Sequence, residues 1–143
     1  MSIAPVPLSI PAPAWALVAF YFLASLAHFA HNAEYIAFYP NMPSWLTREQ
    51  VYLVWVAITC VGVAGLALVR VGQAVAGAAL LSVYGALGLD GLGHYALALC
   101  SEHTLAMNAT ILSEALSGAG LAICCGTLVT GHIVVILRRQ RGA

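Results

Sequence analysis

The stretch VYLVWVAITCVGVAGLALV, residues 51–69, decides the fold class of this chain. It contains no charged residue and is followed directly by Arg70. A membrane-spanning helix needs about 20 predominantly apolar residues at a rise of about 1.5 Å each. The preceding residues Thr47-Arg-Glu-Gln50 have the pattern of a capping box, in which the first and last side chains satisfy backbone N–H groups at a helix start. The sequence therefore predicts a membrane-spanning helix over residues 47–69.

The whole chain has the composition of a membrane protein. Of its 143 residues, 62% are hydrophobic and 7% are charged, whereas about a quarter of the residues of a typical soluble domain are charged. A disordered segment is excluded, because disorder needs high charge and few apolar residues. We expect no nucleic-acid partner, because the five basic residues form no run that could follow a phosphate backbone. The four Cys show no CxxC spacing and are interpreted as small apolar residues.

Three further apolar stretches have the length of a membrane span. They predict helices over residues 14–39, 73–99 and 104–137, joined by short connections. Short connections make successive spans antiparallel neighbours, so we expect one all-α transmembrane domain over residues 1–143, an up-down-up-down four-helix bundle. The last span, at about 34 residues, is longer than a bilayer needs and must tilt, kink or project from one face.

The distribution of arginine predicts the orientation of the chain. In this topology Arg70, Arg138, Arg139 and Arg141 lie on the side of both termini, and Arg48 lies on the other side. Loops rich in Lys and Arg stay in the cytoplasm. We therefore expect a multi-pass protein of a bacterial-type inner (plasma) membrane with both termini cytoplasmic.

Five ionisable side chains fall inside the predicted spans, where such groups are costly and usually mark function. They are His28 and His31 in the first span, Asp90 and His94 in the third, and Glu114 in the fourth. At about 1.5 Å per residue, His28, Asp90 and Glu114 lie about 14–17 Å below the non-cytoplasmic surface, and the other two lie about 8–12 Å below it. Asp90 and His94 are spaced i,i+4 and share one face of an α-helix. We expect all five side chains to meet in one polar chamber.

Three kinds of site fit such a chamber. We favour a transition metal (copper, iron or zinc) bound by His28, His31, Asp90, His94 and Glu114 for redox or hydrolytic chemistry. The alternative is a metal-independent, isomerase-like enzyme that acts on a lipophilic small molecule, with Asp90 and Glu114 as catalytic residues. Haem between facing histidines ranks third, because two acids in a haem pocket would be unusual.

A different interpretation is non-enzymatic. A buried polar network can hold helices together when all its groups are satisfied. The chain would then be an accessory subunit of a larger membrane complex, or a homo-oligomer. Outside the network, His103 is interpreted as an exposed loop or cap residue, and His132 as a hydrogen-bonded structural residue. The glycines of the third span, such as Gly85, are interpreted as helix-packing positions.

Two patterns resemble known families. The run HNAEY at residues 31–35 resembles the HXXEE motif of a bacterial four-span family of unknown function, with Tyr35 in the place of the second glutamate. The histidine and glutamate of the first span, followed by Asp90 and then Asn108, resemble the polar positions of the EXPERA membrane fold of sterol isomerases. The second resemblance implies that a hydrophobic ring system binds between the helices and that protons move through His and acidic residues.

Overall fold

The computed structural model describes residues 8–141 of the chain, and within this range it contains helices and turns but no β-strand. The long helices are α1 (Ala12–Glu34), α2 (Arg48–Arg70), α3 (Ala74–Leu87) and α5 (Leu105–Arg141). A 3-10 segment, η2 (Gly88–Gly93), and the short helix α4 (His94–Leu97) continue the third span beyond α3. Two further 3-10 turns, η1 (Ile36–Phe38) and η3 (Cys100–Glu102), lie in the connections.

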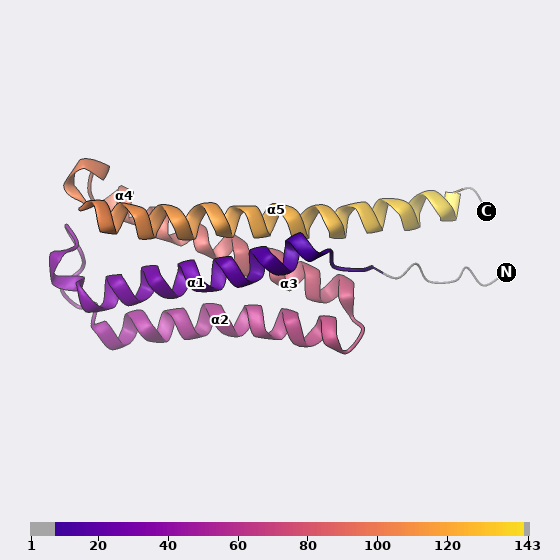
Figure 1. Cartoon of the computed structure of the whole chain (residues 1–143), viewed down its shortest axis with the longest axis horizontal. Coiled ribbons are helices and arrows are strands. Elements are labelled where there is room, and N and C mark those ends of the chain that lie inside the picture. The colour runs from indigo at the N-terminus through magenta and orange to yellow at the C-terminus, as the bar shows by residue number, and fades with distance from the viewer. Residues whose placement is uncertain (1–7, 142–143) are drawn as a thin grey trace.

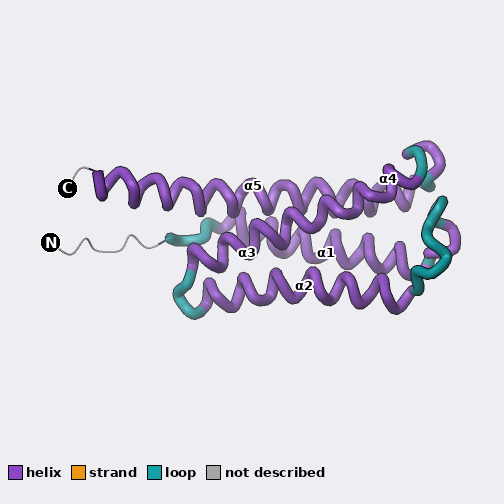
Figure 2. The backbone as a smooth tube through the Cα atoms, turned by 180° about the vertical axis from the view of Figure 1, so that it is seen from behind, coloured by secondary structure: helices purple, strands orange, loops and turns teal. Residues whose placement is uncertain are grey.

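The long helices run alternately in opposite directions and form one bundle (Figure 1). α2 packs against α1 and α3, and α5 packs against the same two helices. The start of α1, the α2–α3 turn and the end of α5 lie together at what we call the terminal end (Figure 1). The turns η1 and η3 lie with α4 at the opposite end, which we call the loop end (Figure 2). The predicted all-α, up-down-up-down four-helix bundle is confirmed.

Four segments are long and apolar enough to cross a membrane. They are Ala12–Glu34, Arg48–Arg70, Ala74–Leu97 and Leu105–Arg141. Their outer surfaces carry large apolar side chains, including Phe20, which is 58% exposed, and Leu53, which is 66% exposed. An apolar surface that covers several helices is unfavourable in water and suits a lipid environment. The chain is therefore a multi-pass membrane protein.

The first connection differs from the prediction and gives the loop end its shape. α1 ends at Glu34 rather than at residue 39, and η1 follows it. Asn41, at φ 56°, adopts the left-handed conformation that Asn tolerates better than most residues, and its Nδ2 donates to the carbonyl of Leu97 at 2.9 Å. In the same connection Tyr39 is 4% exposed. The turn thus buries a tyrosine that the sequence placed at the end of a helix.

α2 begins as predicted. The Gln50 N–H donates to Oγ1 of Thr47 at 3.3 Å, and the Thr47 N–H donates to Oε1 of Gln50 at 2.8 Å. This is the reciprocal capping box that the sequence indicates. Beside it, the Tyr52 hydroxyl donates to Glu34 at 2.9 Å and Arg48 pairs with Glu34 at 3.4 Å, so the start of α2 is tied to the end of α1.

The third span departs most from the prediction. We expected one α-helix over residues 73–99, but α3 ends at Leu87 and a 3-10 segment replaces the next turns. Because a 3-10 helix has three residues per turn, Gly88, Gly91 and His94 line up, and all three are buried. Asp90 turns away from this line and is exposed. The 3-10 winding therefore changes the predicted i,i+4 arrangement, since it leaves His94 buried and Asp90 exposed, although both side chains line one groove on the outer surface of the bundle.

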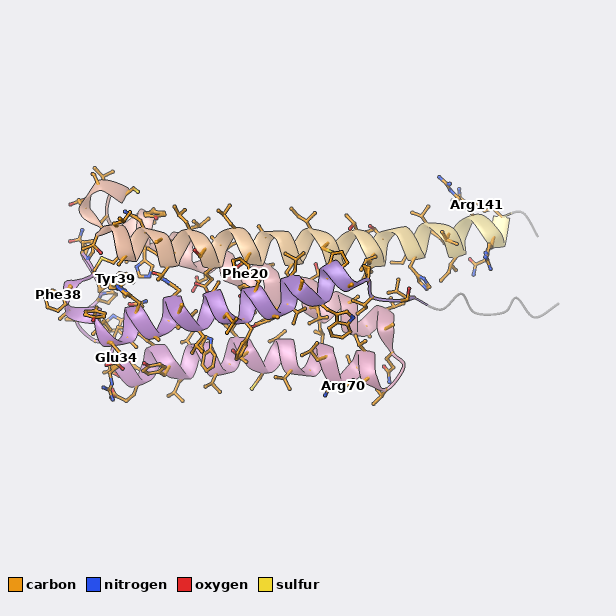
Figure 3. All side chains as sticks on the ribbon, in the orientation of Figure 1. Phe20, Glu34, Phe38, Tyr39, Arg70 and Arg141 are labelled. Carbon is orange, nitrogen blue, oxygen red and sulfur yellow. The ribbon has the colours of Figure 1, made fainter. Side chains whose placement is uncertain are left out.

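α5 accommodates its length by projecting. It has 37 residues, or about 55 Å at 1.5 Å per residue, whereas the hydrocarbon core is about 30 Å thick. The helix extends past the α2–α3 turn and carries Arg141 beyond the rest of the bundle (Figures 1 and 3). This end of α5 is exposed on nearly all sides.

The half of the bundle nearest the terminal end has a closely packed apolar core. Leu81, Leu121 and Cys125 are fully buried there. A Cβ atom added to Gly118 would lie 2.5 Å from the carbonyl oxygen of Gly85, so α3 and α5 touch backbone to backbone. Such close approach is possible because both residues lack a side chain. The interpretation of Gly85 as a packing position agrees with this contact.

Candidate functional site

Glu114 of α5 and His28 of α1 form a buried pair in the half of the bundle nearest the loop end. Oε2 of Glu114 lies 3.6 Å from Nε2 of His28, and the two side chains are 1% and 3% exposed. A Cβ atom added to Gly91 of η2 would lie 3.1 Å from that carboxyl oxygen and 3.7 Å from the same imidazole nitrogen. Because Gly91 has no side chain, the space next to the Glu114–His28 pair stays free of one.

The polar atoms around this pair have no hydrogen-bond partners. Within residues 8–141, both carboxyl oxygens of Glu114, Nδ1 of His28, the Tyr21 hydroxyl and the Ser25 hydroxyl are buried and unpaired. Leaving a buried polar group unpaired costs about 1–3 kcal/mol. Buried ionisable groups of this kind make the Glu114–His28 pair a candidate functional site.

His94 connects the pair to the loop end. Its Nε2 and Nδ2 of Asn32 form a hydrogen bond at 3.2 Å. The ring centroid of His94 lies 5.3 Å from that of His28 and 4.8 Å from that of Tyr39. His94 is thus in contact with the buried pair on one side and with the loop end on the other.

Tyr39 and His31 continue the line toward the surface. The Tyr39 hydroxyl and Nδ1 of His31 are hydrogen-bonded at 2.9 Å. His31 is half-buried and therefore reaches the boundary of the bundle. Burial raises the pKa of Tyr39 to about 12, so the phenol keeps its proton throughout the neutral range. A neutral phenol donates one hydrogen bond and accepts another, as a proton relay requires.

His103 joins the same cluster. It is 6% exposed, and its ring centroid lies 6.1 Å from that of His94 and 5.4 Å from that of Tyr95. Its Nδ1 donates to the carbonyl of Leu99 at 3.0 Å, and its Nε2 is buried without a partner within the described part of the chain. His103 is a loop residue and the C-cap of η3, as one of the two predicted roles has it, but the prediction that it is exposed is wrong, because the turn η3 folds it back beneath the loop end.

A groove of about 340 Å³ opens beside His94, between α2 and the end of the third span. Its apolar lining consists of Phe29, Met42, Leu46, Val51, Val54 and Leu97, and its polar lining of Asn32, Asp90 and His94. Asp90 is exposed along this groove. The groove therefore gives Asp90 and His94 an opening on the outer surface of the bundle.

The structure brings together three of the five predicted site residues. His28, His94 and Glu114 are neighbours, His31 is linked to them through Tyr39, and Asp90 faces the groove instead of the chamber. No three His, Cys, Asp or Glu side chains in the described range could jointly hold a metal ion. The arrangement therefore gives no support to the predicted copper, iron or zinc centre.

Sequence reasoning missed three residues of the site: Tyr21, Ser25 and Tyr39. Tyr21 and Ser25 precede His28 and Asn32 at steps of four, three and four residues, and all four are buried. This spacing is that of one helix face, so the sequence contained a signal for the first two. Tyr39 had no comparable signal, because its position depends on the fold of the turn that follows it.

Comparisons with known proteins identify no relative: no family model matches the chain, and neither a curated protein nor a solved structure matches it. The function is therefore inferred from the geometry of the site.

Proposed function

We propose that this membrane protein carries out metal-independent, isomerase-like acid–base chemistry on a lipophilic small molecule drawn from the bilayer. The observation that carries the proposal is the Glu114–His28 pair, which joins two ionisable groups at 3.6 Å and is almost fully buried inside the bundle. An ionisable group in a membrane costs about 2.5–3.5 kcal/mol on insertion scales. Proteins retain such groups at sites of proton transfer.

The groove beside His94 supports a lipophilic substrate. Most of its lining is apolar, and its polar groups are gathered at Asn32, Asp90 and His94. Small-molecule sites have this composition, with apolar walls that bind the ligand and a few polar groups that orient it. A substrate whose apolar part lies against Val54 and Leu97 would present its reacting carbon atoms to Asp90 and His94.

The proposed reaction moves a carbon–carbon double bond. One of the two groups in the groove, Asp90 or His94, gives a proton to one carbon of the double bond, and the other removes a proton from an adjacent carbon. The electron pair of the broken C–H bond forms the new double bond, so the reaction needs no oxidant or reductant. Glu114 and His28 do not touch the substrate in this scheme. They lie on the side of His94 away from the groove, and they return or remove the proton that His94 exchanges with the substrate.

We also propose a class of substrate and an orientation of the chain in the membrane. The resemblance to sterol isomerases of the EXPERA fold implies the same class of reaction, so we include lipids with fused rings among the expected substrates. The arginines at the terminal end, Arg70 and Arg141 among them (Figure 3), favour cytoplasmic termini. The groove would then open toward the outer leaflet.

Deuterium transfer from water to lipid tests this function without knowledge of the substrate. We would reconstitute the full chain with a total lipid extract in D₂O and search the lipids by mass spectrometry for species that gain deuterium at carbon. We expect such a species with the wild-type protein. We expect its loss in Glu114→Gln and in Asp90→Asn, because each substitution removes a proton-exchanging group.

Glu49→Gln is the matched control, since the Glu49 side chain is 72% exposed and lies outside the site. It should incorporate deuterium as the wild-type protein does. Absence of deuterated lipid with the folded wild-type protein, or equal incorporation in Glu114→Gln, would overturn the proposed function.

A further inference from the structure

We infer that a second groove, which we call the terminal groove, binds an anionic phospholipid, with one acyl chain along its apolar walls and the phosphate beside Arg70. The groove has a volume of about 370 Å³ and lies between α1 and α2, in the half of the bundle nearest the terminal end. It shares no lining residue with the groove beside His94. Lipid binding there is therefore a further property of the chain and does not depend on the proposed reaction.

The walls of the terminal groove are apolar over most of their length. They include Trp15, Val18 and Phe22 of α1, and Val63 and Leu66 of α2. Val63 is 58% exposed, so the groove is open along its outer side. One chain of a two-chain lipid can lie in such a groove while the second chain stays among the neighbouring lipids.

The groove extends inward as far as Tyr84 of α3, which is 2% exposed. A Cβ atom added to Gly62 of α2 would lie 2.8 Å from the Tyr84 ring. Because Gly62 has no side chain, this ring packs directly against the backbone of α2. The groove can therefore hold a chain between the helices and not only on their surface.

The length of the groove matches one leaflet of a bilayer. Arg70 and Thr59 line it at two levels of α2, and the helix between them measures about 16 Å at about 1.5 Å per residue. Half of a hydrocarbon core of about 30 Å is about 15 Å. A groove that begins at the end of α2 therefore follows an acyl chain from the headgroup level to the middle of the membrane.

Arg70 brings an uncompensated positive charge to the outer end of the groove. It is exposed and ends α2 at the terminal end of the bundle (Figure 3). Among the described residues, the ion pairs formed by arginine are those of Arg48 with Glu34 and Glu49, at the other end. An anion from outside the chain can therefore pair with Arg70, and guanidinium groups bind phosphate oxygens through two parallel N–H donors.

The charge of the surroundings favours a lipid with net negative charge over a zwitterionic one. Four of the five arginines lie at the terminal end: Arg70, Arg138, Arg139 and Arg141. The five acidic side chains belong to the loop half: Glu34, Glu49, Asp90, Glu102 and Glu114. Each arginine near the surface of an anionic membrane is worth about 1 kcal/mol.

Trp15 supports the position of the headgroup. It lies in the first turn of α1, is 40% exposed and lines the same groove as Arg70. Tryptophan is enriched at the boundary between hydrocarbon and water, where its ring lies at the level of the headgroups. Arg70 and Trp15 therefore mark the place where the phosphate of the bound lipid leaves the groove.

Native mass spectrometry of the full chain in a non-ionic detergent tests the inference. We would add equal amounts of dioleoyl phosphatidylglycerol, which is anionic, and dioleoyl phosphatidylcholine, which is zwitterionic and has the same acyl chains. The wild-type protein should retain the anionic lipid at least about fivefold more than the zwitterionic one, since about 1 kcal/mol corresponds to that ratio.

Substitutions of arginine separate the groove from the general charge of the terminal end. Arg70→Gln should lower the preference for the anionic lipid by about fivefold, because the paired charge is removed. Arg70→Lys keeps the charge and should keep most of the preference. Arg139→Gln is the matched control, because Arg139 lies at the same end of the bundle and does not line the groove.

A second pair of variants tests the place of the acyl chain. Ala19 is exposed and lines the groove, so the ring added by Ala19→Phe should fill it and reduce retention of both lipids. Ala16 is exposed on the same helix but does not line the groove, and Ala16→Phe should bind as the wild type does. This pair also serves if Arg70→Gln does not fold.

Three results would overturn the inference. Equal retention of the two lipids by the wild-type protein would show that no anionic headgroup is recognised. Equal loss of preference in Arg70→Gln and Arg139→Gln would assign it to the charge of the whole terminal end. Equal retention in Ala19→Phe and Ala16→Phe would show that the acyl chain lies outside the groove.

Discussion

The terminal half and the loop half of the bundle differ in how their helices touch. In the terminal half, backbones meet at glycine positions such as Gly85 and Gly118, and apolar side chains such as Leu81 fill the remaining space. In the loop half, the helices are separated by imidazole, carboxyl and hydroxyl groups, several of them unpaired within the described residues. The close packing of one half can stabilise the fold while the other half holds groups that are unfavourable for stability. Substitutions in the two halves should therefore have effects of different size and opposite sign.

The largest effect is expected at the closest backbone contact. Gly118→Ala places a Cβ atom 2.5 Å from a carbonyl oxygen, and overpacking of this kind costs about 1–3 kcal/mol. The free energy of unfolding in mixed micelles should fall by that amount. Gly131→Ala is the matched control on the same helix, since its Cβ meets nothing within 4 Å, and it should be neutral or stabilising. Similar effects at both positions would mean that the terminal half does not carry the stability.

The second prediction concerns Glu114, where a substitution should not lower the free energy of unfolding and should tend to raise it. Glu114→Gln keeps the volume of the side chain and its capacity to form hydrogen bonds, and it removes the ionisable group. The free energy of unfolding should stay constant or rise by about 1 kcal/mol, since buried ionisable groups in a membrane are unfavourable. The same micelle assay measures it, with Glu49→Gln as the surface control. A clear loss of stability would show that the Glu114–His28 pair holds the helices together.

Removing a polar group of the loop end that is hydrogen-bonded should lower the free energy of unfolding, unlike the removal of an unpaired group. Thr47→Ala removes the side-chain acceptor for the Gln50 N–H, and loss of an N-cap typically costs about 1 kcal/mol. The loss should appear both in unfolding free energy and in faster amide exchange at the first turn of α2. Thr130→Ala, whose hydroxyl bonds a carbonyl of its own helix, should change neither.

The smallest effect at neutral pH concerns Tyr39. Its pKa is raised from 10.0 to about 12 by burial, so the folded protein holds the phenolic proton more tightly than the unfolded chain does. The resulting stabilisation is fully present below pH 10 and is lost as the pH rises through about 12. An alkaline stability profile should show this decline, and Tyr39→Phe should lack it. An identical profile in the variant would mean that the phenol is not shielded from water.

The architecture could be predicted from the sequence, because uninterrupted apolar runs and the Thr47–Gln50 capping box are local signals that the membrane environment makes decisive. The pairing of His28 with Glu114 also followed from counting residues along two helices. The exposed position of Asp90 could not be predicted in this way, because counting residues assumed an α-helix through Gly88–Gly93. Glycines three residues apart permit the tighter 3-10 winding, but glycines in a membrane helix are also interpreted as positions of close helix packing. His103 and Tyr39 depend on turns, whose conformations are set by contacts distant in the sequence.

The overhang of α5 has a practical consequence. About 25 Å of this helix is more than a single crossing requires, and the excess lies clear of the other helices (Figure 1). A fiducial protein joined in continuous helical register after Arg141 would be held rigidly outside a lipid nanodisc. A chain of 143 residues, too small for single-particle electron microscopy by itself, would then present a particle that can be aligned, with the groove and its contents in view.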